Sequence, residues 1–230
     1  MNHVCKNIFL CFLVAGLLAP SARAEESEYG AWLIASADGA LFDVDAPGHW
    51  RYSVQGQFRA FSLADGARQV VGRGGIGYRF NDRLTAWAGY AYFQLHADGV
   101  GTARENRTWQ QVNWNMGAWN RAVWKSRTRL EQRFREGRSG TGWSLRQQLG
   151  VEMPLSAWNG VSLIFSDEVF FDLRQTSWVQ TGFSQNRVFA GLGFKNKGSA
   201  SLEAGYMHQY IRVRESPDLV NHLLILRLKW

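Results

Sequence analysis

The chain has 230 residues, of which 46% are hydrophobic and 20% are charged, and its formal net charge is +7 at pH 7. A positive excess can indicate binding to nucleic acid, but the arginines lie singly at alternating positions and form no basic run, so we expect no nucleic-acid partner. No segment after Ala24 approaches the roughly 18 apolar residues that a membrane-spanning helix requires. Composition therefore argues against a nucleic-acid binder and against a helical membrane protein.

The first 24 residues have the form of an export signal. Lys6 supplies a positive amino-terminal region, Ile8 to Ala19 is apolar, and Ala22-Arg23-Ala24 has the small-x-small form of a cleavage site. Cleavage there would leave residues 25–230 as one domain with a formal net charge of +5, because one lysine and one arginine are removed. Cys5 and Cys11 both lie in this segment, so the mature protein would have no disulfide or thiol chemistry.

The rest of the sequence alternates polar and apolar residues with a period of two. This period is typical of a β-strand whose two faces meet different surroundings. No helical pattern long enough to cover a sheet is present, which favours a closed barrel with an apolar exterior and a polar interior. Eleven strands are predicted, at Tyr29–Ser36, Trp50–Leu63, Gln69–Phe80, Leu84–Leu95, Thr108–Met116, Arg121–Phe134, Trp143–Met153, Val161–Leu173, Gln185–Lys195, Ala200–Val213 and Leu219–Trp230.

The predicted fold is an all-β, antiparallel transmembrane β-barrel of about 12 strands, within a range of roughly 10 to 12. Bacterial barrels of this kind have an even strand number, so a short twelfth strand is expected at Ala40 to Val44. Tight connections such as Asn81 to Arg83 alternate with longer ones such as His96 to Arg107 and Arg174 to Ser184. This alternation predicts short periplasmic turns and longer extracellular loops. Eleven Trp and seven Tyr fit the aromatic girdles of such barrels, and a soluble β-sandwich is the alternative.

Two hairpins repeat one another at a constant spacing. Gly75 and Gly89 recur 116 residues later as Gly191 and Gly205, within matching GxG and AGY motifs. The repetition indicates one architecture throughout the chain. The segment Gly72–Gly77 also matches the dinucleotide-binding pattern GxGxxG, but it leads into a turn and another strand, so we reject that site. We expect these alternate glycines instead to make room for bulky side chains in the lumen or to permit sharp strand curvature.

The last strand carries the most specific local signal. Its outward positions are apolar and the chain stops on an aromatic residue, as in strands that the barrel-assembly machinery recognises in outer-membrane proteins. The residues of this signal are Leu224, Leu226, Leu228 and Trp230. We therefore expect the outer membrane as the location, and outer-membrane lipid, lipopolysaccharide and the assembly machinery as partners.

Several motifs together resemble a known family. They are Trp32, Glu105–Gln111 (ENRTWQQ), Arg127–Phe134 (RTRLEQRF) and Gln185–Arg187 before Gly191–Gly193. This pattern resembles an uncharacterised Gram-negative domain-of-unknown-function family of outer-membrane β-barrel-like proteins, and the similarity covers nearly all residues after the first 24. The resemblance implies a fold and a location, and it implies no reaction.

The charged face of the Arg121–Phe134 strand, joined by neighbouring strands, gives the candidate functional residues. The predicted lumen residues are Lys125, Arg127, Arg129, Glu131, Arg133, Arg146, Glu152, Glu168, Arg187 and Glu203, with Asp172 beside them. One hypothesis is a narrow pore or solute-binding barrel whose basic polar lumen takes small anionic solutes. The alternative is a structural barrel, plugged by an Arg–Glu network that holds the strands in register.

An enzyme is the third possibility. No nucleophile elbow, HExxH motif, paired cysteines or phosphate loop is present, so we predict no catalytic residue, no cofactor and no metal. His208 and His222 lie on the outward face, with Ser216 between them, which leaves a lipid-modifying enzyme of the outer leaflet as an alternative. Histidines of an interfacial girdle are the simpler interpretation.

Asp167 falls on the outward face of its strand, so a β-bulge or strand end is expected there.

Overall fold

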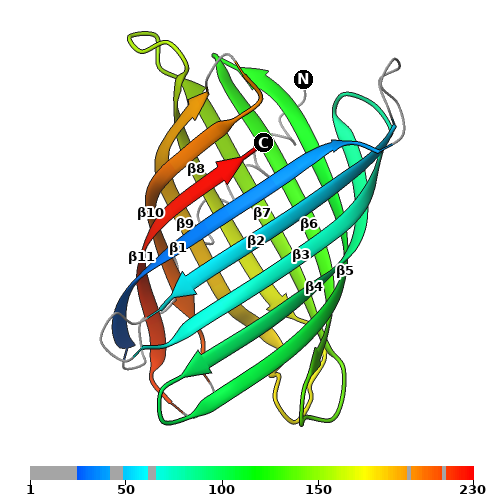
Figure 1. The fold of residues 1–230 in the computed structure, drawn as a ribbon, viewed down its shortest axis with the longest axis vertical. Helices are drawn as coiled ribbons and strands as arrows, with labels where there is room; N and C mark the ends of the chain where they lie inside the picture. Colours follow the sequence, from blue (N-terminus) through cyan, green and yellow to red (C-terminus); the bar gives the residue numbers. More distant parts are fainter. Residues whose placement is uncertain (1–24, 42–48, 62–65, 196–197, 214–215) are drawn as a thin grey trace, which may run out of the picture.

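The computed structural model describes residues 25–41, 49–61, 66–195, 198–213 and 216–230, so the predicted export signal lies outside the described residues. These residues form one closed β-barrel (Figure 1). The strands are β1 (Glu25–Ala40), β2 (Trp50–Ala60), β3 (Arg68–Arg79), β4 (Leu84–Ala97), β5 (Gly101–Trp119), β6 (Ala122–Arg135), β7 (Gly142–Pro154), β8 (Val161–Asp172), β9 (Gly182–Lys195), β10 (Ser201–Ile211) and β11 (Asp218–Lys229).

The barrel closes where β1 meets β11, and these two strands are parallel. Each strand otherwise pairs antiparallel with its neighbour in sequence. With an odd number of up-and-down strands, the first and last run in the same direction, so closure requires one parallel pair. The all-β barrel is confirmed, whereas the expectations of a fully antiparallel sheet and of an even number of strands are wrong for the described residues.

The predicted twelfth strand does not separate from the first. Ala40 is the last residue of β1 and Leu41 is a bend, while residues 42–44 lie outside the described residues. Eleven strands already complete the ring of hydrogen bonds. Among the described residues, no helix is long and apolar enough to cross a membrane.

The two ends of the barrel do not divide into short turns and long loops as predicted. We call the end where β1 and β11 finish the upper end, and the opposite end the lower end (Figure 1). The expected long connection from His96 to Arg107 is wrong, because β4 and β5 pair as far as Ala97 and Gly101 around a tight turn. The connection 173–181 remains a loop at the lower end, whereas at the upper end β1 finishes at Ala40 and β2 begins only at Trp50.

Inward-facing aromatic side chains fill space that glycines leave open. Gly75 pairs with Gly89, and a Cβ atom on either one would lie within 2.5 Å of the Trp109 ring. Gly191 and Gly205 pair in the same register beside Phe189, so the repeated hairpins share both a motif and a local packing. The prediction that alternate glycines of Gly72–Gly77 make room for bulky lumen neighbours is therefore confirmed for Gly75 and Gly77, which lie beside Trp109 and Trp87, but Gly72 and Gly74 have no such neighbour.

Asp167 has a different setting from the predicted one. It pairs with Val188 in regular register, and the irregularity between β8 and β9 lies further along, between Phe170 and Phe171. The Asp167 carboxylate is accommodated by a side-chain partner, since Asn186 Nδ2 donates to Asp167 Oδ1 at 2.5 Å. The predicted bulge at Asp167 is wrong because a hydrogen bond, and not a break in the strand, satisfies this polar group.

Candidate functional site

The structure brings seven of the ten predicted lumen residues into one network of ion pairs in the middle of the barrel. They are Arg127, Arg129, Glu131, Arg133, Arg146, Glu168 and Arg187, and they extend from β6, β7, β8 and β9. The other three lie in smaller groups towards the upper end. Glu152 binds Lys125 and Lys195, and Glu203 binds Arg227.

Glu131 is the most enclosed charge of the network, with a relative exposure of 1%. Its Oε1 accepts from Arg146 Nη1 at 2.7 Å and from Arg129 Nη1 at 3.4 Å, while its Oε2 accepts from Arg107 Nη1 at 2.8 Å. A carboxylate removed from water to this extent is stable only with such charged donors. Alternation in β6 places Glu131 and Arg129 on the inward face together.

Glu168 forms the second centre of the network. Its Oε1 accepts from Arg127 Nη2 and from Arg146 Nη2, each at 2.8 Å, and Arg187 Nη1 lies 3.8 Å from its other oxygen. Arg146 thereby joins the two glutamates and links β6, β7 and β8. Because each of these contacts joins side chains of different strands, the network fixes the positions of these side chains relative to one another.

Towards the lower end the network continues through two residues that are absent from the predicted lumen set. Glu105 Oε1 lies 2.7 Å from Arg133 Nε and 2.7 Å from Arg107 Nε. Arg133 also lies 3.6 Å from Asp172, which was predicted as a neighbour. Glu105 and Arg107 entered the prediction only as part of the ENRTWQQ motif. The period-two alternation of β5 was a sufficient signal to place both of them inside.

Aromatic rings pack against several guanidinium groups of the lumen. Arg59 lies 4.2 Å from the centre of the Trp32 ring, and Arg107 lies 3.9 Å from that of Phe93. Arg187 is 4.6 Å from the Phe170 ring. Such contacts stabilise a desolvated cation through the electron-rich face of the ring. They also fill the lumen, so the middle of the barrel is packed with side chains.

Positive charge exceeds negative charge in this central layer. The layer contains eight arginines and four carboxylates, namely Arg59, Arg73, Arg107, Arg127, Arg129, Arg133, Arg146 and Arg187 against Glu105, Glu131, Glu168 and Asp172. Within the part of the chain that the structure describes, neither Arg59 nor Arg73 forms an ion pair. Arg59 donates to Gln57 and Gln69, and Arg73 donates to Gln55 at 3.4 Å.

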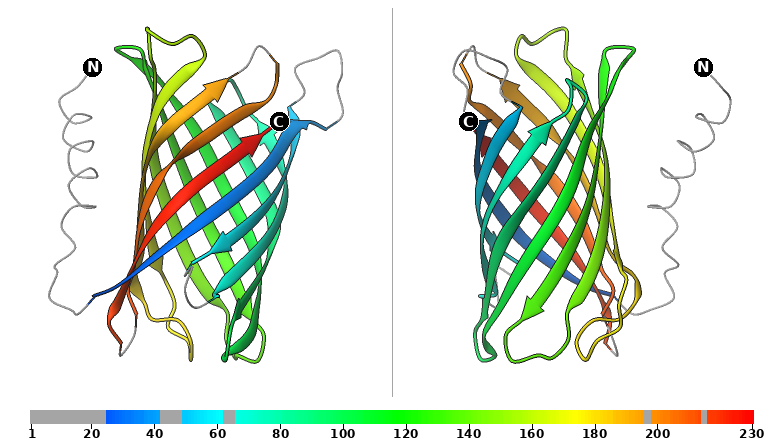
Figure 2. Two further views of the ribbon diagram at one scale, coloured as in Figure 1. Left: turned by 60° about the vertical axis from the view of Figure 1, so that its left-hand side comes forward. Right: turned by 90° about the vertical axis from the view of Figure 1, so that its right-hand side faces the viewer.

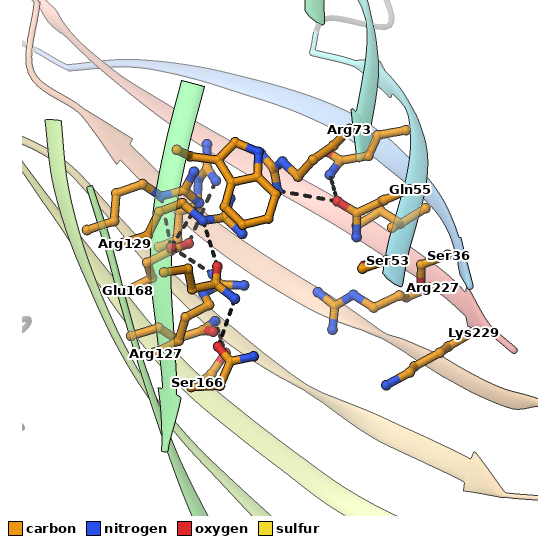
Figure 3. Close-up of a pocket in the computed structure, with 18 of the residues that line it drawn as sticks. Ser36, Ser53, Gln55, Arg73, Arg127, Arg129, Ser166, Glu168, Arg227 and Lys229 are labelled. Carbon is orange, nitrogen blue, oxygen red and sulfur yellow. Dashed lines mark hydrogen bonds and ion pairs between the residues drawn. The ribbon is translucent and has the colours of Figure 1, made fainter. Parts of the chain in front are cut away.

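Two cavities lie on either side of this layer. The upper chamber has a volume of about 350 Å³ and contacts Arg73, Arg127 and Glu168, as well as Arg227 and Lys229 nearer the upper end (Figure 3). The lower chamber has a volume of about 180 Å³. Three side chains line both chambers and therefore form the partition between them: Arg59, Arg146 and Arg187.

Comparison with known proteins places this barrel in a family. The family model described as "Protein of unknown function (DUF2490)" matches residues 29–220. The chain belongs to the DUF2490 family. An uncharacterized protein of Methylorubrum extorquens is 31% identical to it over 221 residues, which cover 95% of this chain and 93% of that protein. No solved structure matches the chain.

The motifs that indicated the family occupy both sides of the DUF2490 barrel wall. In ENRTWQQ, Glu105, Arg107 and Trp109 point into the lumen, whereas Thr108 and Gln110 are exposed on the outer surface. The RTRLEQRF segment divides in the same way along β6. These motifs thus contribute side chains both to the lumen network and to the exterior of the barrel.

The two histidines of the enzyme alternative lie opposite each other on the exterior, in β10 and β11. The Tyr206 hydroxyl lies 2.6 Å from His222 Nδ1, and His222 also stacks on Tyr29 at a ring separation of 5.0 Å. The His208 and His222 rings are 5.8 Å apart. This aromatic setting favours a girdle. Among the described residues, no group of three His, Cys, Asp or Glu is arranged to hold a metal ion.

Proposed function

We propose that this protein is an outer-membrane β-barrel that binds small anionic solutes in its upper chamber. The observation that carries the proposal is the excess of arginine in the central layer, and above all Arg73, which faces the upper chamber without an ion-pair partner among the described residues. An unpaired guanidinium in an enclosed polar cavity is a recognition group for a carboxylate or a phosphate.

The exterior supports the membrane location. Large apolar side chains are exposed around β11, β1, β2 and β3, including Leu33, Val54, Ile76, Leu224 and Leu226. Aromatic side chains gather near both ends of the strands: Trp50, Phe80, Trp119 and Trp230 at the upper end, and Tyr29, Phe134 and Phe171 at the lower end. An apolar band between aromatic belts suits a bilayer, because water would disfavour so much exposed apolar surface.

The charges of the upper chamber suit capture of an anion. Arg227 and Lys229 lie between the upper end and the central layer, where they pair with Glu203 and Asp38, and Lys229 is half exposed, at 53% of its side chain. A solute entering from the upper end would meet these cations first and Arg73 afterwards (Figure 3). The walls also carry neutral polar groups, including Gln55, Gln111 and Asn113, which can donate and accept hydrogen bonds.

The partition argues for binding over free conduction. Arg146 is held by both Glu131 and Glu168, and Arg59 and Arg187 pack against the Trp32 ring. Passage through the lumen would require these side chains to move. A structural barrel with a plugged lumen is the second candidate function, favoured by the dense ion-pair network around Glu131. The two candidates differ in whether the upper chamber takes a ligand.

Thermal unfolding of the folded barrel in detergent tests the proposal, with inorganic phosphate as the probe at constant ionic strength. Binding to the folded state alone stabilises it, by about 2.7 kcal/mol when phosphate is at 100 times its dissociation constant. We expect phosphate to raise the unfolding midpoint of the wild type and to have little effect on Arg73→Gln. Arg104→Gln removes the same charge from an exposed lower-end pair with Glu136 and serves as the matched control. An equal response of wild type and Arg73→Gln would contradict the proposed site.

A further inference from the structure

Polar side chains gather in one region of the barrel exterior, between exposed apolar side chains such as Val112 and Trp114 on β5 and Phe134 on β6. Six uncharged polar side chains point outwards on three neighbouring strands, and we call them the outer polar patch: Thr108 and Gln110 on β5, Ser126, Thr128 and Gln132 on β6, and Gln147 on β7. They alternate with Trp109, Gln111, Arg127 and Arg129, which line the upper chamber. In Figure 2 (right) β5 and β6 face the viewer.

The residues of the outer polar patch hydrogen-bond to one another across the strands. Gln110 Nε2 donates to Gln132 Oε1 at 3.2 Å, and Gln132 Nε2 donates to Gln110 Oε1 at 2.9 Å. Thr128 donates to Gln147 Oε1 at 2.6 Å. Each glutamine has two N–H groups and two acceptor lone pairs. Gln147 donates to both Ser126 and the Gln148 carbonyl, and Gln132 Oε1 also accepts from Thr108, so among the described residues one N–H of Gln110 and one of Gln132 remain unused.

The outer polar patch lies at the middle of the strands and not at a membrane interface. Gln110 is midway along β5 (Gly101–Trp119), and Thr128 is midway along β6 (Ala122–Arg135). A membrane strand spans the hydrocarbon with about 9 to 11 residues, so the midpoint of a 14-residue strand such as β6 lies within it. Lipid tails cannot satisfy the unused polar groups at this depth.

We propose that the outer polar patch is a self-association surface, on which a second copy of this chain docks within the membrane. The proposal rests on the outer-membrane location argued above. A partner at this depth must itself span the membrane, and a second copy presents the same groups at the same height. Because the patch is uncharged and contains donors and acceptors together, a two-fold axis through it brings complementary groups face to face without like-charge repulsion.

The opposite half of the exterior supplies the comparison surface. Its outward side chains at similar positions along the strands are apolar, with Val54 exposed to 52% and Leu224 to 65%. Lipid tails can cover this half without leaving polar groups unsatisfied. The contrast separates a face for lipid from a face for protein within one barrel.

Oxidative cross-linking in isolated outer membranes tests the inference. Gln110→Cys places a thiol on the outer polar patch, and Val54→Cys places one on the apolar half as the matched control. We expect oxidation with copper phenanthroline to give a disulfide-linked dimer from Gln110→Cys and none from Val54→Cys. A cross-link from Gln110→Cys to a different protein, or equal dimer yields from both variants, would overturn the inference.

A mass measurement provides a second test that needs no new thiol. In mild detergent, sedimentation should give the wild type a protein mass of two chains and the triple variant Gln110→Leu, Thr128→Val, Gln132→Leu that of one chain. Heat-modifiable gel mobility checks that both barrels are folded. A wild type that is in the outer membrane but has the mass of one chain would refute self-association alone, whereas a wild type absent from the outer membrane would refute the proposed function as well.

Discussion

Arg146 Nη1 lies 2.7 Å from Glu131 Oε1 in the middle of the barrel, and both side chains are almost fully buried. The same guanidinium also reaches Glu168 on the next strand. Arg146 is therefore the residue through which the two central carboxylates of the network share a counter-charge. Removing it would leave each carboxylate with fewer donors in a site that little water can reach.

Breaking this pair should destabilise the barrel strongly. We expect Arg146→Gln or Glu131→Gln to lower the free energy of unfolding by roughly 3–5 kcal/mol, because each leaves an uncompensated buried charge. Arg129→Gln should act in the same direction. Lys195→Gln, which removes a mostly exposed partner of Glu152, should change it by at most about 1 kcal/mol. Urea unfolding of the refolded barrels measures all four, and equal midpoints would contradict a buried network.

The partition predicts low conductance. In planar bilayers we expect the wild type to give no steady open-channel current, since Arg59, Arg146 and Arg187 separate the two chambers. Shortening two of them together, Arg59→Ala with Arg187→Ala, should open a path and raise the current. The remaining arginine excess should make that current anion-selective. A steady current from the wild type, equal to that of the double variant, would show that the partition does not close the lumen.

The paired glycines predict a sharp difference between two alanine substitutions. A Cβ atom on Gly89 would lie 2.2 Å from the Gly74 carbonyl oxygen and 2.4 Å from the Trp109 ring. We expect Gly89→Ala to destabilise the barrel by about 1–3 kcal/mol through overpacking. Gly56→Ala is the control, because a Cβ atom there meets nothing within 4 Å. A lower unfolding midpoint for Gly89→Ala than for Gly56→Ala would show that the backbone and Trp109 cannot move aside for the added Cβ atom.

The terminal strand predicts how the protein reaches the membrane. Leu224, Leu226 and Trp230 are exposed on the outside of β11, in keeping with an assembly signal. We expect fractionation to find the mature protein in the outer membrane as a heat-modifiable band. Deleting Trp230 or changing Leu228 to Asp should reduce insertion while export continues. Recovery of the wild type as a soluble periplasmic species would refute the location.

The girdle interpretation of the two histidines predicts no effect on lipid chemistry. Changing His208 and His222 to Ala together should leave the lipid A and phospholipid profiles of the cell unchanged. The reason is that His222 already hydrogen-bonds to Tyr206 and stacks on Tyr29. Mass spectrometry of extracted lipids measures this. An acyl chain that is missing in the parent strain and restored by the double variant would favour the enzyme alternative.

Much of the barrel was determined by the local alternation of residues. The period of two decides which side chains share a face, so it is enough by itself to place Arg127, Arg129, Glu131 and Arg133 inside. The paired glycines were predictable for the same reason, since a constant spacing of 116 residues preserved both their face and their register. The family could also be recognised from such motifs.

Only the tertiary structure decided how the strands close and which charges meet. The parallel contact of β1 with β11 joins opposite ends of the chain, and no local pattern encodes it. The bridge from Arg146 to Glu131 and Glu168 depends on the register of three strands. Alternation alone puts Thr128 and Gln132 on the face opposite the charged residues, but their hydrogen bonds with Gln147 and Gln110 depend on the register between strands. Side-chain direction is a local property, whereas contact across strands depends on register and closure, which the whole barrel sets.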